Sequence, residues 1–334
     1  MGYRLAMLLR PHDTPFDRSR AQVPDTTRGR GMGRKATGLF AVAAMAIALG
    51  GASTGAGAQD GACAQSARSG GKETGSKEAS GPGGATGPAL GLAAIWSDTG
   101  TLLLSDGRRF MPEGIALPSR LASDAALPRA AESAAWAVLD TCLVGFGSAH
   151  VDRHGRLSGP GWLACPARNA PAEEDLATAL LRAGAGYAQP NGQDRQCLTQ
   201  RLAAETQART ARRGIWAEPS AVAPAGDEEA MAIRAGLFTV AEGRVLAAGG
   251  TRDRIFLNFG SSWRQDFTAM MEREDFATIM GDSLEPAMLR GTLVQVRGVV
   301  RAEGGPAIML RRPGEIALQA GAQARAARGK RGGE

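Results

Sequence analysis

A short polar turn near the middle of the chain carries side chains suited to phosphate chemistry. The stretch HVDRHGRLSG, residues 150–159, places an aspartate, two arginines and two histidines around Gly155, between two apolar runs. A guanidinium that projects from such a turn can hold a phosphate through parallel hydrogen bonds. Metal-assisted hydrolysis of a phosphodiester also needs carboxylates that hold the metal ion and a base that activates water. Arg156 alone would therefore bind a phosphate without cleaving it.

Regular elements are predicted on both sides of this turn. Leu102–Leu104 and Phe110–Leu117 flank Asp106-Gly107, which predicts a β-hairpin. Strands are expected at 141–151 and 161–165, around the turn itself. Helices are expected at 124–140, 173–186 and 197–216. The first of them has an apolar stripe at helical spacing, and the other two end at glycine. The stripe consists of Leu127, Ala131, Ala134, Ala135 and Val138.

The C-terminal third reads as a second, β-rich unit. Residues 219–230 are rich in Ala and Pro and are predicted to be a linker. Beyond them, about five short strands with glycine turns predict a small barrel over 231–318. A short helix is expected around Phe276–Met280 or Glu285–Leu289. The predicted fold class is therefore α+β and rich in β-barrel, with two barrels in series.

The N-terminal residues 1–58 have the layout of a secretory signal peptide behind a basic extension. Arg34 and Lys35 precede an apolar run at 36–49, and Ala56-Gly57-Ala58 fits a cleavage site after Ala58. The run is short for a membrane span, although a signal anchor is the alternative. Translation starts at Met1 or Met32. We expect a periplasmic or secreted protein whose mature chain has no membrane span.

The basic character of the chain is concentrated at its ends. Residues 59–88 have almost no large apolar side chains and are predicted to be a disordered linker, and 319–334 a disordered basic tail. Residues 1–35 carry a net charge of +5 and residues 319–334 carry +3, so the total of +6 leaves −2 for 36–318. The pI of about 9.6 is therefore not evidence that the folded part binds nucleic acid.

Export to an oxidising compartment permits disulfides among the four cysteines. Cys142 and Cys165 flank the polar turn almost symmetrically, so a cross-strand bridge is one option. A pairing of either one with Cys197 is equally open. Cys63 falls in the predicted linker. No CxxC spacing occurs, so a zinc site is not expected.

The order of these elements resembles the thermonuclease (staphylococcal-nuclease-like) family. The resemblance covers about 90–218 and rests on the ordered set rather than on any single piece. The matching residues are Asp106-Gly107, Asp152 to Arg156, Leu176 to Ala188, Glu205 to Arg209, and Gly214-Ile215-Trp216. It implies an OB-type barrel and calcium-dependent cleavage of DNA or RNA, with two arginines at the phosphate. Glu205 and Arg209, spaced i,i+4, are expected to pair along their helix.

Most polar roles of that family are missing from this sequence. By position, the two metal carboxylates are replaced by Gly100 and Ala116, the second arginine by Met111, and the general base by Ser119. Of the five polar roles, only that of Arg156 keeps its family residue. A hard divalent cation needs several oxygen ligands, so no cofactor is expected. Shifting the motif to Pro112-Glu113 would restore one carboxylate, but it would delete a strand.

These observations predict a catalytically degenerate protein with a nucleic-acid-binding, anion-binding or structural role in the cell envelope. The alternative is an active calcium-dependent nuclease that uses substitute carboxylates such as Asp98 or Glu113. His154 is expected to be an exposed turn residue.

The second unit holds the chain's only interleaved aromatic and basic residues, in IFLNFGSSWRQDF, 255–267. Trp263, Arg264 and Phe267 are candidates for a face on which bases stack. The competing interpretation is core packing, because Ile255, Leu257 and Phe259 alternate. The pattern is similar to the second barrel that often follows exported thermonuclease-like domains.

Overall fold

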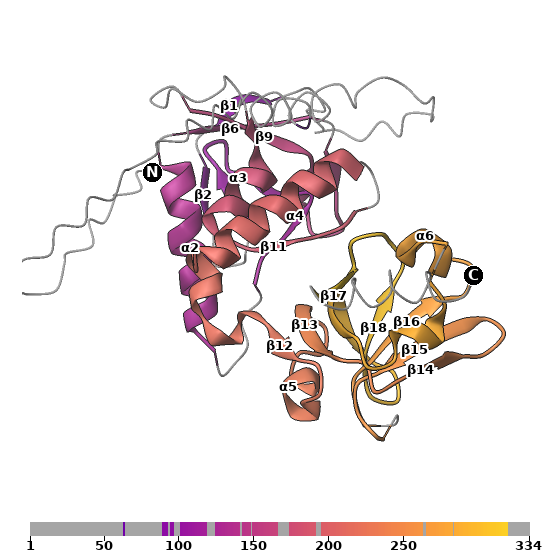
Figure 1. Ribbon diagram of the computed structural model, residues 1–334. Coiled ribbons are helices and arrows are strands. Elements are labelled where there is room, and N and C mark those ends of the chain that lie inside the picture. The colour runs from indigo at the N-terminus through magenta and orange to yellow at the C-terminus, as the bar shows by residue number, and fades with distance from the viewer. Residues whose placement is uncertain are drawn as a thin grey trace, which may run out of the picture. The chain divides into compact units, whose positions relative to one another are not determined.

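The computed structural model (Figure 1) describes Cys63 and most of the chain from residue 89 to residue 319. All of these residues belong to one compact unit, Ala52–Glu334. The described ranges are 89–92, 94–96, 101–118, 124–140, 142–147, 149–165, 174–191, 195–262, 265–282 and 284–319. The predicted signal peptide, the predicted linker apart from Cys63, and the predicted tail from residue 320 lie outside them.

The N-terminal module, 89–218, is built on short strands in three sheets. Their orders are β1-β6-β9-β10, β2-β3-β4-β8-β7 and β11-β5. The strands are β1 (Ala89–Leu92), β2 (Ala94–Trp96), β3 (Leu102–Leu104), β4 (Arg109–Pro112), β5 (Ile115–Ala116), β6 (Leu143–Phe146), β7 (His150–Val151), β8 (Leu157–Gly159), β9 (Gly161–Ala164), β10 (Glu174–Asp175) and β11 (Tyr187–Ala188). The antiparallel β3–β4 pair is the hairpin predicted from Asp106-Gly107, and Gly107 has the positive φ of 85° that such a turn requires.

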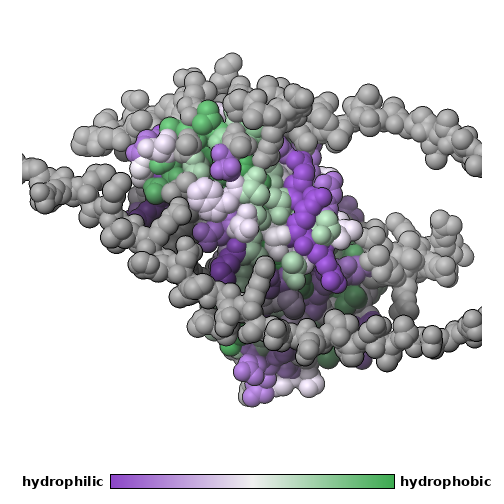
Figure 2. Space-filling model, turned by 90° about the vertical axis from the view of Figure 1, so that its left-hand side faces the viewer, coloured by the Kyte–Doolittle hydropathy of each residue, from purple (hydrophilic) through white to green (hydrophobic). Residues whose placement is uncertain are grey.

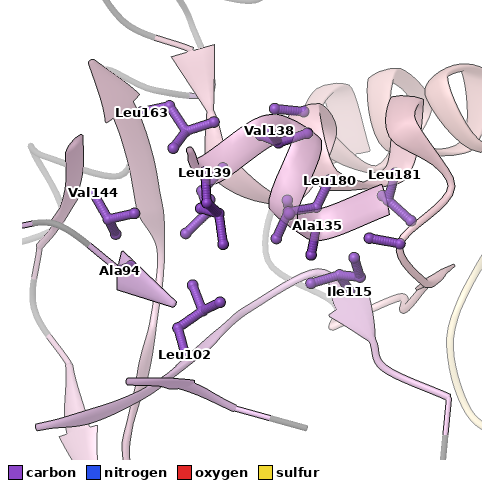
Figure 3. Close-up of a cluster of buried hydrophobic side chains, with 14 of the residues drawn as sticks. Ala94, Leu102, Ile115, Ala135, Val138, Leu139, Val144, Leu163, Leu180 and Leu181 are labelled. Atoms are coloured by element: carbon purple, nitrogen blue, oxygen red, sulfur yellow. The ribbon is translucent and has the colours of Figure 1, made fainter. Parts of the chain in front are cut away.

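Three helices cover this module, as the sequence predicts. They are α2 (Ala126–Leu139), α3 (Leu176–Ala183) and α4 (Arg195–Thr210), followed by the 3-10 turns η1 (Gly214–Ala217) and η2 (Pro219–Ala221). The predicted apolar stripe of α2 is buried. Figure 3 shows Val138 and Leu139 of this helix packed between the strand residue Val144 and the α3 residue Leu180. Asp175 is the N-cap of helix α3 and accepts a hydrogen bond from the Thr178 amide, and left-handed Gly184 is its C-cap.

The C-terminal module is built on one eight-stranded sheet. Its order is β12-β13-β17-β18-β16-β15-β14, and β19 pairs with β17 off this path. The elements are β12 (Ala223–Pro224), α5 (Glu228–Ala232), β13 (Phe238–Arg244), β14 (Ala247–Gly250), β15 (Arg254–Asn258), β16 (Thr268–Glu272), α6 (Phe276–Met280), η3 (Pro286–Leu289), β17 (Leu293–Ala302), β18 (Pro306–Leu310) and β19 (Ile316–Leu318). Both positions at which a short helix was expected are helical.

The segment 219–230, expected to be a linker, has regular structure. It contains η2 and β12, and β12 pairs in parallel with β13. A third apolar cluster joins side chains of the two modules here, with Trp216 and Tyr187 from the first and Val240 from the second. The Tyr187 and Trp216 rings meet edge to face at 5.6 Å. Buried apolar residues therefore connect the two modules.

The fold is α+β and strand-rich, which confirms the predicted class in its general form. None of the helices in the described ranges has the length and apolar character needed to cross a bilayer. Figure 2 shows hydrophilic and hydrophobic residues side by side on one face of the molecule, with a continuous hydrophilic band.

Candidate functional site

The turn that carries Arg156 is held together by the side chain of Asp152. One carboxylate oxygen accepts from the backbone amides of His154 (2.8 Å) and Arg156 (3.0 Å). The other accepts from Arg156 Nε at 2.7 Å. The hydrogen bond from the Arg156 amide, followed by the bond from its side chain, lowers the pKa of Asp152 to about 2. Arg156 is therefore paired within its own turn.

The strand next to the turn presents Met111 at the neighbouring position. Strands β4 and β8 are parallel, with Phe110 opposite Leu157 and Met111 opposite Ser158. Phe110 is buried in the core, whereas Met111 is half-buried. Met111 thus stands two residues along from Arg156, and its thioether offers neither charge nor an N–H donor to an anion.

The side chain of Ala116 is buried in β5. It is 8% exposed, pairs across the strands with Tyr187, and belongs to the apolar cluster between the modules. A methyl group at this position cannot ligate a metal. The remaining candidate positions of the family site lie outside the described ranges; they are Asp98, Gly100 and Ser119.

Glu113 lies in the turn between β4 and β5. Its amide donates to the carbonyl of Gly159 (2.9 Å), and its carboxylate accepts from Asn191 at 3.4 Å. The β4–β8 register separates Glu113 from the Arg156 position by four residues, or roughly 13 Å along the strands. Within the described ranges, no three His, Cys, Asp or Glu side chains are grouped closely enough to hold a metal ion.

A buried ion pair lies against the turn between β4 and β5. Arg201 of α4 contacts both carboxylate oxygens of Asp175, at 2.9 and 3.1 Å. Its guanidinium packs directly against Gly114, where a β-carbon would lie 2.1 Å from Arg201 Nη1. The carboxylate of Asp175 thus anchors α3 and α4, and sequence reasoning did not identify it.

The expected helical pair of Glu205 with Arg209 is wrong. Glu205 is buried and accepts two hydrogen bonds from Arg297 of β17, both 2.9 Å long. Arg209 instead donates to Glu242 of β13 at 2.7 and 3.0 Å. Burial raises the pKa of Glu242, but the bonds from Arg209 and Gln295 outweigh it and the net shift is downward. Each member of the i,i+4 pair finds a partner in the other module.

Two disulfides are present. Cys142 is bonded to Cys165, across the edge of the β6–β9 pair. Cys197 is bonded to Cys63, so the open alternatives that paired it with Cys142 or Cys165 do not occur. The disulfide of Cys63 could not be predicted from cysteine spacing, because its two cysteines lie 134 positions apart. Disulfides are typical of proteins outside the cytoplasm.

The aromatic side chains of 255–267 divide between core and surface. Phe267, a candidate for base stacking, is 1% exposed and stacks on Phe259 at 5.1 Å in the core of the C-terminal module. Phe267 is therefore a core residue. Phe256 points outward, since Ile255 and Leu257 fill the interior. Trp263 and Arg264 lie outside the described ranges.

The two histidines of the turn region lie at its surface. His154 is exposed, and its Nε2 lies 3.1 Å from Arg153 Nε. His150 in β7 is exposed as well.

No family model and no curated protein matches the sequence. Among solved structures, the chain is similar to the aspartyl tRNA synthetase from Entamoeba histolytica, at 16% identity and a TM-score of 0.22 over 28% of this chain and 20% of that one. It is also similar to the OBody AM1L10 bound to hen egg-white lysozyme, at 20% identity and a TM-score of 0.19 over 26% of this chain and 82% of that one. The chain spans about a fifth of the synthetase's length. Scores this low carry no argument about function.

Proposed function

We propose that this chain is an exported thermonuclease-like protein that has lost phosphodiester hydrolysis and acts in the cell envelope as a binding or structural protein. In this proposal both modules are OB-type barrels, and the mature chain begins after Ala58. The eight-stranded sheet of the second module supports its OB assignment. The two disulfides support a location outside the cytoplasm.

The proposed loss of hydrolysis rests on one observation. The residues at two family positions, Ala116 and Arg156, make contacts that have no catalytic role. The Ala116 methyl group is buried among apolar side chains, and Arg156 is paired with Asp152. Met111 adds to this, because it stands beside Ser158 where the family resemblance expects the second phosphate arginine. A phosphate at this turn would compete with the Asp152 carboxylate for one guanidinium, so anion binding there is expected to be weak.

The alternative, a calcium-dependent nuclease with substitute carboxylates, depends on Asp98 or Glu113. Asp98 lies outside the described ranges. Glu113 lies in the turn after β4, about 13 Å along the strands from the Arg156 position. Glu113 would need further oxygen ligands to hold calcium.

The test is to incubate the purified exported chain with single- and double-stranded DNA, with and without calcium. We expect no calcium-dependent cleavage. Cleavage that is lost in Arg156→Ala and Glu113→Gln, but retained in the control Arg153→Ala, would establish the alternative. Fluorescence anisotropy with the same DNA separates the remaining roles. Salt-sensitive binding without cleavage indicates nucleic-acid binding, and its absence leaves a role that does not involve nucleic acid.

A further inference from the structure

A groove of about 500 Å³ lies on the outer face of the C-terminal module. Its floor comes from β15, β16 and β18, which lie side by side in the sheet (Figure 1). The turns that follow β14 and β17 contribute to its walls. The volume falls in the range of small-molecule sites in proteins.

Two rows of side chains cross the floor from strand to strand. In one row Phe256 lies opposite Met270. In the other, Asn258 lies opposite Thr268, which in turn lies opposite Ala307. The neighbours of these residues in β15 and β16 belong to the core cluster, so both rows face outward. Strand spacing and the rise per residue make the floor about 10 Å wide and about 7 Å long, which suits a flat molecule of about two fused rings.

The Phe256 ring is the largest apolar surface of the floor, and it is only half-buried. The residue opposite it on β14 is Gly249, which has no side chain to cover the ring. A β-carbon placed on Gly249 would meet nothing within 4 Å, so the space beside the ring is open. On the other side, Met270 adds a polarizable thioether. An aromatic face next to open space favours stacking by a flat, apolar molecule.

The polar pair of the floor leaves one amide group free to donate. The side-chain oxygen of Asn258 accepts from the Thr268 hydroxyl at 3.1 Å. An asparagine amide also carries two N–H donors, and none of the described residues accepts from those of Asn258. Because Asn258 lines the groove, a carbonyl oxygen of a bound molecule can accept a hydrogen bond there.

The two carboxylates that line the groove already have partners in the protein. Asp266 accepts from the Ser262 amide, and Glu303 has Arg301 at 3.6 Å. A bound anion would be repelled by both carboxylates, and a bound cation would have to compete with their present partners. A saccharide would need more unpaired polar groups than this floor offers.

A guanidinium also lies against the wall of the groove, but its N–H groups are engaged. A β-carbon placed on Gly250 would lie 3.0 Å from Arg273 Nη2. Arg273 donates to the carbonyl oxygens of Thr251 and Arg252. Since the charged groups at the groove are already paired, an uncharged ligand is favoured.

We infer that this groove binds an uncharged, flat compound of about two fused rings that carries a carbonyl oxygen. The rings stack on Phe256 and contact Met270, and the carbonyl oxygen accepts from the Asn258 amide. The inference uses none of the residues on which the proposed function rests, because it concerns the other module.

The test titrates the exported chain, labelled with ¹³C at its methionine methyl groups, with chromone. Chromone is uncharged and has two fused rings and one carbonyl group. We expect saturable NMR shifts of the Met270 methyl signal, because a ligand stacked on Phe256 lies beside it. The affinity should change by less than about twofold when salt rises from about 0.02 M to about 0.2 M, because no ion pair forms. Naphthalene has the same ring shape without an acceptor and is the matched ligand.

Two variants separate the hydrogen bond from the stacking. Asn258→Asp keeps an acceptor for the Thr268 hydroxyl but removes the N–H donors. It should weaken chromone by about fivefold or more and change naphthalene by less than about twofold. Phe256→Ala should weaken both ligands by about tenfold. The control Val299→Ala, at an exposed position of β17 outside the groove lining, should bind both normally. Thermal unfolding establishes that the variants are folded.

Three outcomes would overturn the inference. The first is the absence of Met270 shifts up to the solubility limit of chromone. The second is an equal change for chromone and naphthalene in Asn258→Asp. The third is displacement of chromone by a thymidine oligonucleotide or by maltohexaose, because the groove would then belong to a charged or polyhydroxyl ligand.

Discussion

At the scale of single residues, several of the described arginines serve as partners of carboxylates within the protein. Arg156 closes its own turn on Asp152, Arg201 anchors Asp175, and Arg297 binds Glu205. An arginine in a phosphate-binding sequence context is therefore weak evidence for a phosphate site until its carboxylate partners are known.

Replacing Arg297 with methionine should be strongly destabilising. Arg297 and Glu205 are 3% and 4% exposed, so the substitution leaves a buried carboxylate without its cation. We expect a loss of about 3–5 kcal/mol in the free energy of unfolding, measured by urea denaturation. The control is Arg301→Met on the same strand, whose exposed ion pair at 3.6 Å should cost less than about 1 kcal/mol. Equal losses in the two variants would contradict a structural role for the buried pair.

At the scale of elements, the sequence predicted correctly those structures that depend on residues close together in the chain. The Asp106-Gly107 hairpin, the α2 stripe and α6 all depend on spacing within a few residues, and all three are present. The partners of Glu205 and Arg209 could not be predicted in this way. The i,i+4 spacing favoured a helical pair, whereas the actual partner of Glu205 lies 92 positions away.

The junction between α3 and η1 depends on two glycines in close contact. A β-carbon on Gly184 would lie 2.2 Å from the Arg213 carbonyl oxygen, and φ at Gly184 is 83°. We expect Gly184→Ala to cost more than about 3 kcal/mol, because backbone strain and a backbone clash add together. Gly155→Ala is the control, since φ is 73° but the space around it is open, and it should cost about 1–2 kcal/mol. Chemical denaturation compares the two, and similar losses would show that the close contact is unimportant.

At the scale of the whole molecule, the candidate site was predictable in part. The sequence placed Arg156 in a polar turn between strands and placed Met111 and Ala116 in neighbouring segments, as the structure has them. The sequence could not show that Arg156 forms an ion pair with Asp152, or that Ala116 is buried against the second module. It also left Phe267 open between a base-stacking face and core packing, and the structure places this side chain in the core.

Two disulfides also link distant parts of the molecule, and the last prediction concerns their removal. In the chain-entropy model the stabilisation grows with the length of chain that a bond encloses, to about 3 kcal/mol for Cys142–Cys165 and about 5 kcal/mol for Cys63–Cys197. The variant Cys142→Ala/Cys165→Ala should therefore lose less free energy of unfolding than Cys63→Ala/Cys197→Ala in non-reducing urea denaturation. Peptide mapping of the untreated protein is the control and should recover these two pairs. A mixed pairing, or unchanged stability of the second variant, would mean that Cys63 does not anchor the chain to α4.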